Sequence, residues 1–382
     1  MVNTNKEPYL SVVLPCLDEE ATIGTCIKKV QEVFLRLGIA GEIIVVDNGS
    51  KDRSFEIASS LGARVIKEPQ RGYGAAYLAG LREARGSFIV IGDSDDTYDF
   101  YEIPKFFEAL QKGFDFVIGS RFRGTIKKGA MSWANRYIGN PILSGMTRIF
   151  FHTRLTDIHC GMRAFTKEAY QRMNLMTLGM EFATEMVVAA LMNNLKICEI
   201  PITYHPRLGK SKLSPFADAW RNIRFMLIFC PQWLYFVPGV LGFSLGIILL
   251  LILSRGPVFF LGHYWDIHFM FFASLLSILS YHILNLGVYA HTFALRQGFL
   301  RYDSLTLFFK RHFNLERGIF LGVFILLPAV IILAVIFWEW LGSNFGPLYR
   351  IRESILALTL FIIGLQTIFS SFFISLLFIE RR

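Results

Sequence analysis

Two carboxylates that follow an apolar run carry the clearest chemical signal in this sequence. The run that ends at Ile91 continues through Gly92 into Asp93-Ser94-Asp95. Open α/β sheets bind their ligands at the carboxyl ends of parallel strands, which is where such a strand would place these acids. Asp93 and Asp95 could share Mg²⁺ or Mn²⁺ and hold it against a diphosphate, because both cations prefer oxygen ligands. An isolated pair also fits an acidic turn or a helix N-cap, so the neighbouring strand ends decide between the two.

Two other strand ends carry acids as well. The first strand runs into Asp18-Glu19-Glu20, and the second runs into Asp47-Asn48-Gly49-Ser50. Either segment alone is ordinary turn and N-cap chemistry. Together with Asp93 and Asp95 they place acids along one edge of a sheet. This arrangement favours a nucleotide-binding crevice, in which Glu19 and Asp47 accept hydrogen bonds from a base or a ribose.

The elements that must position these acids alternate between strand and helix. Short β-rich runs are separated by stretches of helical length, which predicts βαβ units and a mainly parallel sheet. The expected strands are 10–14, 42–46, 63–66, 87–91 and 114–119, and the expected helices are 19–37, 52–61, 74–84 and 104–112.

The second half of the chain predicts a membrane domain. The whole sequence is 53% hydrophobic, and the excess lies in four apolar runs at about 233–253, 267–289, 319–340 and 355–379. Each is long enough to cross a bilayer, which takes ~20 residues. We therefore expect a soluble domain over 1–213, an amphipathic helix in the membrane interface over 214–231, and a domain of four spans over 232–382.

The basic residues predict the orientation of these spans. Lysines and arginines concentrate before the first span, in the segment 295–318 and at Arg381-Arg382, so both termini and the middle loop are expected in the cytoplasm. Arg350 and Arg352 lie on the opposite side and count against this orientation. The N-terminus lacks the apolar core of a signal peptide, which also favours a cytoplasmic first domain.

The charge and the cysteines narrow the function classes. The net charge of +9 comes largely from residues beside the apolar runs, which favours a membrane surface and phosphate ligands over nucleic acid. The five cysteines form no CxxC pair, so reduced thiols are favoured over a zinc site.

These motifs together resemble family 2 glycosyltransferases with the GT-A fold, in the polyprenyl-phosphate branch that includes dolichyl-phosphate mannose synthases. The resemblance covers about residues 8–215. It rests on Val13-Leu14-Pro15 with Glu19-Glu20, Val45-Val46-Asp47-Asn48-Gly49-Ser50, Gly72-x-Gly74-x-Ala76, Asp93-x-Asp95, Gly119-Ser120-Arg121, Trp133 with Arg136, Asp157 with Gly161-Met162-Arg163, Glu199-Ile200-Pro201-Ile202 and Arg207-x-Gly209-x-Ser211-Lys212.

The resemblance implies a role for each matching position. The base and ribose would be lined by Pro15, Leu17, Glu19 and Asp47, and the metal and donor diphosphate would be held by Asp93 and Asp95. A basic loop of Arg207, Lys210 and Lys212 would close over the phosphates. The acceptor phosphate would meet Arg121, Arg136, Asn140 and Arg163, and the catalytic set would be Asp95, Asp157, Arg121 and Arg136. Three positions depart from the family pattern: Asp18 replaces the usual Asn, Met162 the usual Phe and Asn140 the usual Ser.

The expected activity is an inverting, metal-dependent transfer of one hexose from a nucleotide sugar to a polyprenyl phosphate at the cytoplasmic leaflet. UDP-glucose is the favoured donor and GDP-mannose the next. A processive polysaccharide synthase is an alternative, although the QxxRW signature of those enzymes is absent. A lipid-carrier flippase or scaffold with a nucleotide-sensing domain is another, although few charged residues lie within the spans. A homo-oligomer is left open.

Overall fold

The computed structural model describes residues 8–208, 215–230, 232–296 and 314–378. The chain forms two compact units, Met1–Met226 and Leu227–Arg382. Each unit is described by itself below. Lys210 and Lys212, which the sequence predicts in the phosphate-binding loop, lie outside the described residues.

The N-terminal unit is built on a seven-stranded sheet with helices on both faces. The strand order is β3-β2-β1-β4-β6-β5-β7, and only β6 runs antiparallel to its neighbours. The strands are β1 (Leu10–Cys16), β2 (Gly41–Asp47), β3 (Arg64–Lys67), β4 (Phe88–Ile91), β5 (Phe116–Ile126), β6 (Arg163–Thr166) and β7 (Ile197–Tyr204). The helices are α1 (Ile23–Leu37), α2 (Ser54–Ser60), α3 (Tyr73–Glu83), α4 (Ile103–Gln111), α5 (Asn140–Phe151), α6 (Lys167–Met173), α7 (Phe182–Met192) and α8 (Pro215–Phe229), with short helices η1 (Phe100–Glu102) and η2 (Asn135–Gly139).

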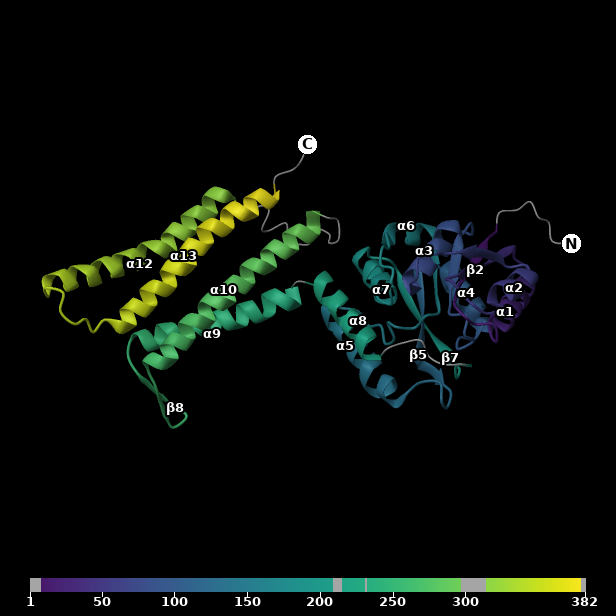
Figure 1. Ribbon diagram of the computed structural model, residues 1–382, viewed down its shortest axis with the longest axis horizontal. Helices are drawn as coiled ribbons and strands as arrows, with labels where there is room; N and C mark the ends of the chain where they lie inside the picture. The colour runs from purple at the N-terminus through teal and green to yellow at the C-terminus, as the bar shows by residue number, and fades with distance from the viewer. Residues whose placement is uncertain (1–7, 209–214, 231, 297–313, 379–382) are drawn as a thin grey trace. The chain divides into compact units, whose positions relative to one another are not determined.

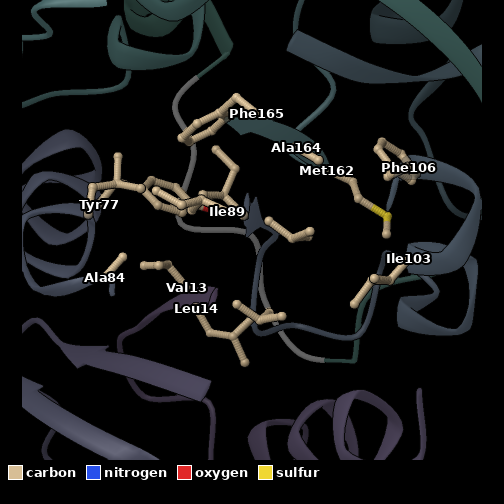
Figure 2. Close-up of a cluster of buried hydrophobic side chains, with 14 of the residues drawn as sticks. Val13, Leu14, Tyr77, Ala84, Ile89, Ile103, Phe106, Met162, Ala164 and Phe165 are labelled. Carbon is tan, nitrogen blue, oxygen red and sulfur yellow. The ribbon is translucent and has the colours of Figure 1, made fainter. Parts of the chain in front are cut away.

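The central strands are continuous apolar runs because both of their faces are covered. β1 is buried along almost its whole length, as is typical of a parallel strand between two layers of helices. Figure 2 shows Tyr77 of α3 and Ala84, the residue after α3, packed on one side of the sheet, and Ile103 and Phe106 of α4 on the other. The expected α/β architecture with a mainly parallel sheet is therefore confirmed.

The antiparallel strand β6 determines what lies beside the end of β4. Arg163 pairs with Ile91, so the segment that precedes β6 lies just beyond the carboxyl end of β4. Because β6 runs in the opposite direction, residues 157–162 come next to the acids that follow β4. The sequence does not predict this strand, because its place in the sheet depends on pairing with β4 and β5.

The described residues of the C-terminal unit form four long helices. These are α9 (Val237–Ser254), which continues the short helix η3 (Gln232–Phe236), α10 (Ile267–Arg296), α12 (Leu315–Gly342) and α13 (Ile351–Phe378). All four are long and apolar enough to cross a membrane, which confirms the expected four spans and makes the chain an integral membrane protein. A short hairpin of β8 (Val258–Phe260) and β9 (His263–Trp265) joins α9 to α10 (Figure 1).

Side-chain hydroxyl groups join helices α10 and α13 of this unit. The side chains of Ser274 and Thr359, of Tyr281 and Thr367, and of Tyr289 and Ser370 hydrogen-bond between α10 and α13 over 2.6–2.7 Å. The residue numbers rise together along both helices, so α10 and α13 run parallel, as two helices separated by one further span must. Interhelical hydrogen bonds of this kind hold helices together where no water competes.

Candidate active site

Asp93 is fixed by two tyrosines of α3. The hydroxyl groups of Tyr73 and Tyr77 donate to Asp93 Oδ1 over 2.9 and 3.2 Å. Both tyrosines lie on one face of the helix because they are four residues apart. Among the described residues no hydrogen bond reaches Asp93 Oδ2. One carboxylate oxygen is thus committed to the protein, and the other is available to a ligand.

The segment before β6 packs closely against Asp93. A Cβ atom at Gly161 would lie 2.7 Å from Asp93 Oδ2 and 3.1 Å from the Tyr98 hydroxyl. The Gly161 N–H donates to that hydroxyl over 2.7 Å. A side chain at position 161 would therefore displace the carboxylate oxygen that remains available, which explains why glycine is needed there.

Asp95 contacts a threonine on one side and an arginine on the other. The backbone N–H and the hydroxyl of Thr97 donate to Asp95 Oδ1 over 3.1 and 2.6 Å. Arg207 Nη1 lies 3.5 Å from Asp95 Oδ2, and Arg207 Nη2 bonds to Glu19 Oε1. The guanidinium thus connects the end of β1 to the acids after β4.

Burial and the charge of a neighbouring carboxylate raise the pKa of Asp93. Burial and, after it, the charge of the nearby Asp95 carboxylate together raise this pKa to about 6, against the lowering effect of the two tyrosine hydroxyls. A cation placed between the two carboxylates would relieve this repulsion. Arg207 already contributes in that direction through its positive charge.

The expected donor-binding residues lie at the ends of β1 and β2. Ser94 Oγ donates to the carbonyl of Pro15 over 2.6 Å, which joins the loop after β4 to the end of β1. Asp47 is 7% exposed and its Oδ1 accepts from Ser50 N over 3.0 Å. Leu17 and Glu19 are half-buried beside this edge. The structure thus gathers Pro15, Leu17, Glu19, Asp47, Asp93, Asp95 and Arg207 at one edge of the sheet.

The departure at Asp18 has a conformational explanation. Asp18 has φ 49°, a left-handed conformation that Asn and Asp tolerate better than other residues with side chains. Its Oδ1 accepts from Lys51 N over 2.7 Å, and its N–H donates to Ser50 Oγ over 3.0 Å. Aspartate can therefore replace asparagine in this turn without changing the backbone.

Arg121 and Asp157 form a buried ion pair. Arg121 Nε and Nη2 donate to the two oxygens of Asp157 over 2.7 and 2.8 Å, and Arg121 N donates over 3.0 Å. Asp157 is 0% and Arg121 7% exposed. Burial alone would raise the pKa of Asp157, but the Arg121 guanidinium outweighs it and holds this pKa below its usual value. The structure therefore joins two of the expected catalytic residues to each other.

The expected role of Arg163 in acceptor binding does not agree with its surroundings. Its side chain is 1% exposed. Nε, Nη1 and Nη2 donate to the carbonyls of Cys160, Ala183 and Ile158 over 2.8, 2.6 and 2.8 Å. A guanidinium enclosed by three backbone carbonyls holds the chain together and cannot reach an external phosphate, so Arg163 leaves the acceptor set.

Arg136 and Asn140 lie in an exposed part of the expected site. Arg136 is exposed within η2, with its guanidinium 5.5 Å from the centre of the Tyr137 ring, and Asn140 begins α5. Large apolar side chains surround them, with exposed fractions of 46–68%. We call these the η2–α5 apolar face, which comprises Trp133, Tyr137, Ile138, Ile142 and Ile149. The opposite side of α5 is buried and Thr147 donates to Met226 of α8 over 3.1 Å.

Sequence reasoning missed several residues that shape the site. Tyr73 and Tyr77 bond to Asp93, Thr97 bonds to Asp95, and Tyr98 accepts from Gly161 N. Glu199, for which the motif gave no role, accepts through Oε1 from three donors at positions 156 and 157 over 2.8–3.0 Å. The four-residue spacing of Tyr73 and Tyr77 is visible in the sequence, but it is equally typical of a helix that packs against a core. Nothing in the sequence marks their hydroxyl groups as partners of Asp93.

The available oxygens fit a divalent cation whose other ligands come from a substrate. Asp93 and Asp95 each offer one carboxylate oxygen, and Mg²⁺ usually binds through one or two carboxylates together with phosphates and water. Within the described ranges no group of three or more His, Cys, Asp or Glu side chains could hold a metal ion. Of the described residues, Asp93 and Asp95 would therefore supply only part of a coordination shell, which a substrate would complete.

The fold and this edge of acids define a family 2 glycosyltransferase with the GT-A fold, and the chain belongs to that family. Residues 11–173 match the model described as glycosyl transferase family 2, and residues 288–378 match its C-terminal transmembrane region. The chain is of the polyprenyl-phosphate sugar transferase type, and it is an enzyme.

The chain is also similar to several individual proteins of known name. The chain is 37% identical to the low-salt glycan biosynthesis hexosyltransferase Agl6 of Haloferax volcanii over 96% of this chain and 88% of that protein. It is 34% identical to a dolichyl-phosphate hexose transferase of the same organism, over 54% of this chain and 88% of that protein. Among solved structures, it is similar to the glucosyl-3-phosphoglycerate synthase of Mycobacterium tuberculosis in complex with Mn²⁺, UDP and glucosyl-3-phosphoglycerate. That match has 21% identity and a TM-score of 0.49, and covers 58% of this chain and 80% of that one.

Proposed function

We propose that this enzyme transfers a single hexose from a nucleotide sugar to a polyprenyl phosphate at the cytoplasmic leaflet. UDP-glucose is the favoured donor and GDP-mannose the next. The observation that carries the proposal is the gathering of Glu19, Asp93, Asp95 and Arg207 at the carboxyl edge of the sheet. The dolichyl-phosphate hexose transferase relative supports a lipid phosphate as acceptor.

The donor side of the site has acids for the nucleoside and a cation for its phosphates. Asp47 and Glu19 would accept hydrogen bonds from the base and ribose beside Pro15 and Leu17. Asp93 and Asp95 would hold Mg²⁺ or Mn²⁺, which supplies positive charge for the donor diphosphate. The guanidinium of Arg207 would then move from Asp95 to the phosphates, together with the basic residues Lys210 and Lys212.

The acceptor side faces the membrane surface in this proposal. The η2–α5 apolar face would lie among lipid headgroups, where aromatic side chains such as Trp133 and Tyr137 are favoured. Helix α8 has the same character: Trp220 and Ile228 are 60% and 62% exposed, whereas Asn222, Phe225 and Met226 are buried. Arg136 and Asn140 would then meet a phosphate that is confined to the same surface.

The proposed reaction is a single displacement at the anomeric carbon. An oxygen of the lipid phosphate forms a bond to that carbon as the bond to the diphosphate breaks, and the nucleoside diphosphate leaves with the electron pair. A phosphate oxygen is already ionised at neutral pH, so positioning and charge neutralisation matter more than a strong general base. The buried Arg121–Asp157 pair would position the loop next to Gly161 rather than move a proton.

Purified full-length protein with a polyprenyl phosphate and radiolabelled donors tests the proposal. We expect a lipid-linked single hexose with UDP-glucose in the presence of Mn²⁺ or Mg²⁺, with inverted anomeric configuration, and none after chelation. Asp95→Asn should abolish turnover. Glu108→Gln is a matched control, since Glu108 is an exposed acid paired only with Lys112 on α4. No lipid-linked product with any common nucleotide sugar would refute the proposal, and a polymeric product would favour a polysaccharide synthase.

A further inference from the structure

The hairpin between α9 and α10 exposes four large apolar side chains. Phe259, Phe260, Leu261 and Tyr264 have exposed fractions of 62, 54, 76 and 74%. The two strands pair antiparallel with Val258 opposite Trp265 and Phe260 opposite His263. Figure 1 shows the hairpin leaving the ends of α9 and α10 and turning away from the helices.

The base of the hairpin is part of the helical core. Val258 and Trp265 pack on a buried cluster of α9 and α10 that includes Leu253 and Met270. The Trp265 ring stacks on Phe269 of α10, with ring centres 4.3 Å apart and planes 12° apart. The hairpin therefore projects from a fixed base, and its tip does not fold back over the bundle.

The backbone at the tip of the hairpin is strained, and the strained position holds an apolar side chain. Leu261 and Gly262 both have positive φ, at 51° and 78°. A two-residue turn of this kind prefers Asn-Gly or Asp-Gly, and a left-handed conformation is unfavourable for a residue such as leucine. A bulky apolar residue that is both strained and 76% exposed is explained if an apolar surrounding compensates for the strain.

We infer that this hairpin is an anchor in the membrane interface, and that Phe259, Leu261 and Tyr264 insert among the lipids. The hairpin lies between two spans, so it emerges in the leaflet that α9 reaches after one crossing. Each strand has three residues, so the tip stays within about 10 Å of the helix ends.

Lipid is the occupant that the surroundings favour. The hairpin is continuous in sequence with two membrane spans, and aromatic side chains concentrate at the boundary between acyl chains and headgroups. Its outer strand edges keep unpaired backbone groups that hydrocarbon would not satisfy, which limits insertion to the interface. The exposed Arg255 beside the base suits anionic lipid phosphates.

A fluorescent probe near the tip tests this inference without any assay of sugar transfer. His263→Cys would carry an NBD label in a Cys198→Ser background, since the other four cysteines are buried. The protein is reconstituted into vesicles of phosphatidylcholine and phosphatidylglycerol. We expect blue-shifted emission, quenching by spin labels at the top of the acyl chains, and little quenching by aqueous iodide.

Two substitutions of Leu261 separate membrane contact from turn stability. Leu261→Met keeps an apolar side chain and should keep the quenching pattern. Leu261→Asn gives the turn its preferred residue, so the thermal midpoint in detergent should hold or rise while lipid quenching falls and iodide quenching increases. Iodide access in the parent protein would overturn the inference. Protection from both quenchers would also overturn it, because the occupant would then be a protein.

Discussion

Removal of the negative charge from Asp157 should strongly destabilise the N-terminal unit. Asp157→Asn leaves the Arg121 guanidinium buried without a counter-charge, in a place where Arg121 is 7% and Asp157 0% exposed. Breaking a buried ion pair by removing one partner costs about 3–5 kcal/mol. The asparagine also replaces an acceptor oxygen by an NH₂ group that faces the Arg121 donors.

The expected change is large enough to measure as a thermal shift. For units of about this size, 1 kcal/mol corresponds to roughly 2–4 °C, so the midpoint should fall by about 6–20 °C. A thiol-reactive fluorogenic dye reports on this unit, because Cys16, Cys26 and Cys160 are at most 2% exposed and react only on unfolding. Cys198→Ser in the background removes the partly exposed thiol.

A double variant distinguishes pairing from separate structural roles. Arg121→Met should also destabilise, because it leaves the Asp157 carboxylate buried alone. Arg121→Met with Asp157→Asn should cost about 1–3 kcal/mol less than the two single changes together, since neither charge remains unpaired. Additive losses, or a shift below about 2 °C for Asp157→Asn, would refute the view that the ion pair holds this loop.

Three other predictions follow from the site. Arg207→Ala should tighten binding of Mn²⁺ in the absence of nucleotide, measured by electron paramagnetic resonance on the full chain, because the guanidinium competes for Asp95 and Glu19; equal affinities would contradict this. Tyr73→Phe removes one hydroxyl from Asp93 and should weaken Mn²⁺ binding about tenfold, whereas Tyr170→Phe should not. Burial lowers the pKa of His159 from 6.5 in the unfolded chain to about 4 in the folded protein. As pH falls, the unfolded chain therefore binds a proton at this histidine before the folded protein does, and the folded protein loses stability between about pH 6.5 and 4. His159→Gln should reduce the fall in thermal midpoint over that range, and an identical pH profile would show that another group is responsible.

The sequence predicts the sheet and the spans well because their signals are local. The run at Val12–Leu14 is apolar on both faces, and each span is longer than any buried helix of the first unit. Element types therefore follow from periodicity and length alone. The expected strands 10–14, 42–46 and 87–91 correspond to β1, β2 and β4. The antiparallel strand β6 cannot be predicted from periodicity and length, because it depends on pairing with β4 and β5.

The partners of the site residues depend on contacts between distant positions. Arg121 and Asp157 are 36 residues apart, and Asp93 meets Tyr73 and Tyr77 only after α3 packs on the sheet. The family resemblance gives Arg163 a role at the acceptor, whereas in the structure its buried side chain donates to backbone carbonyls instead. An arginine in a motif can thus bind a ligand or hold the chain, and only burial and partners distinguish the two.

The same distinction applies to the two arginines that oppose the expected orientation. Arg350 bonds to Glu339 and Glu353, and Arg352 bonds to Asp266 and to the Leu253 carbonyl. Arg352 thereby ties the start of α13 to the end of α9 and the start of α10. Their place on that side of the bundle follows from these structural contacts, which need an arginine at the helix ends. Many more basic residues lie in the segments expected in the cytoplasm, so the asymmetry that orients membrane proteins persists despite these two.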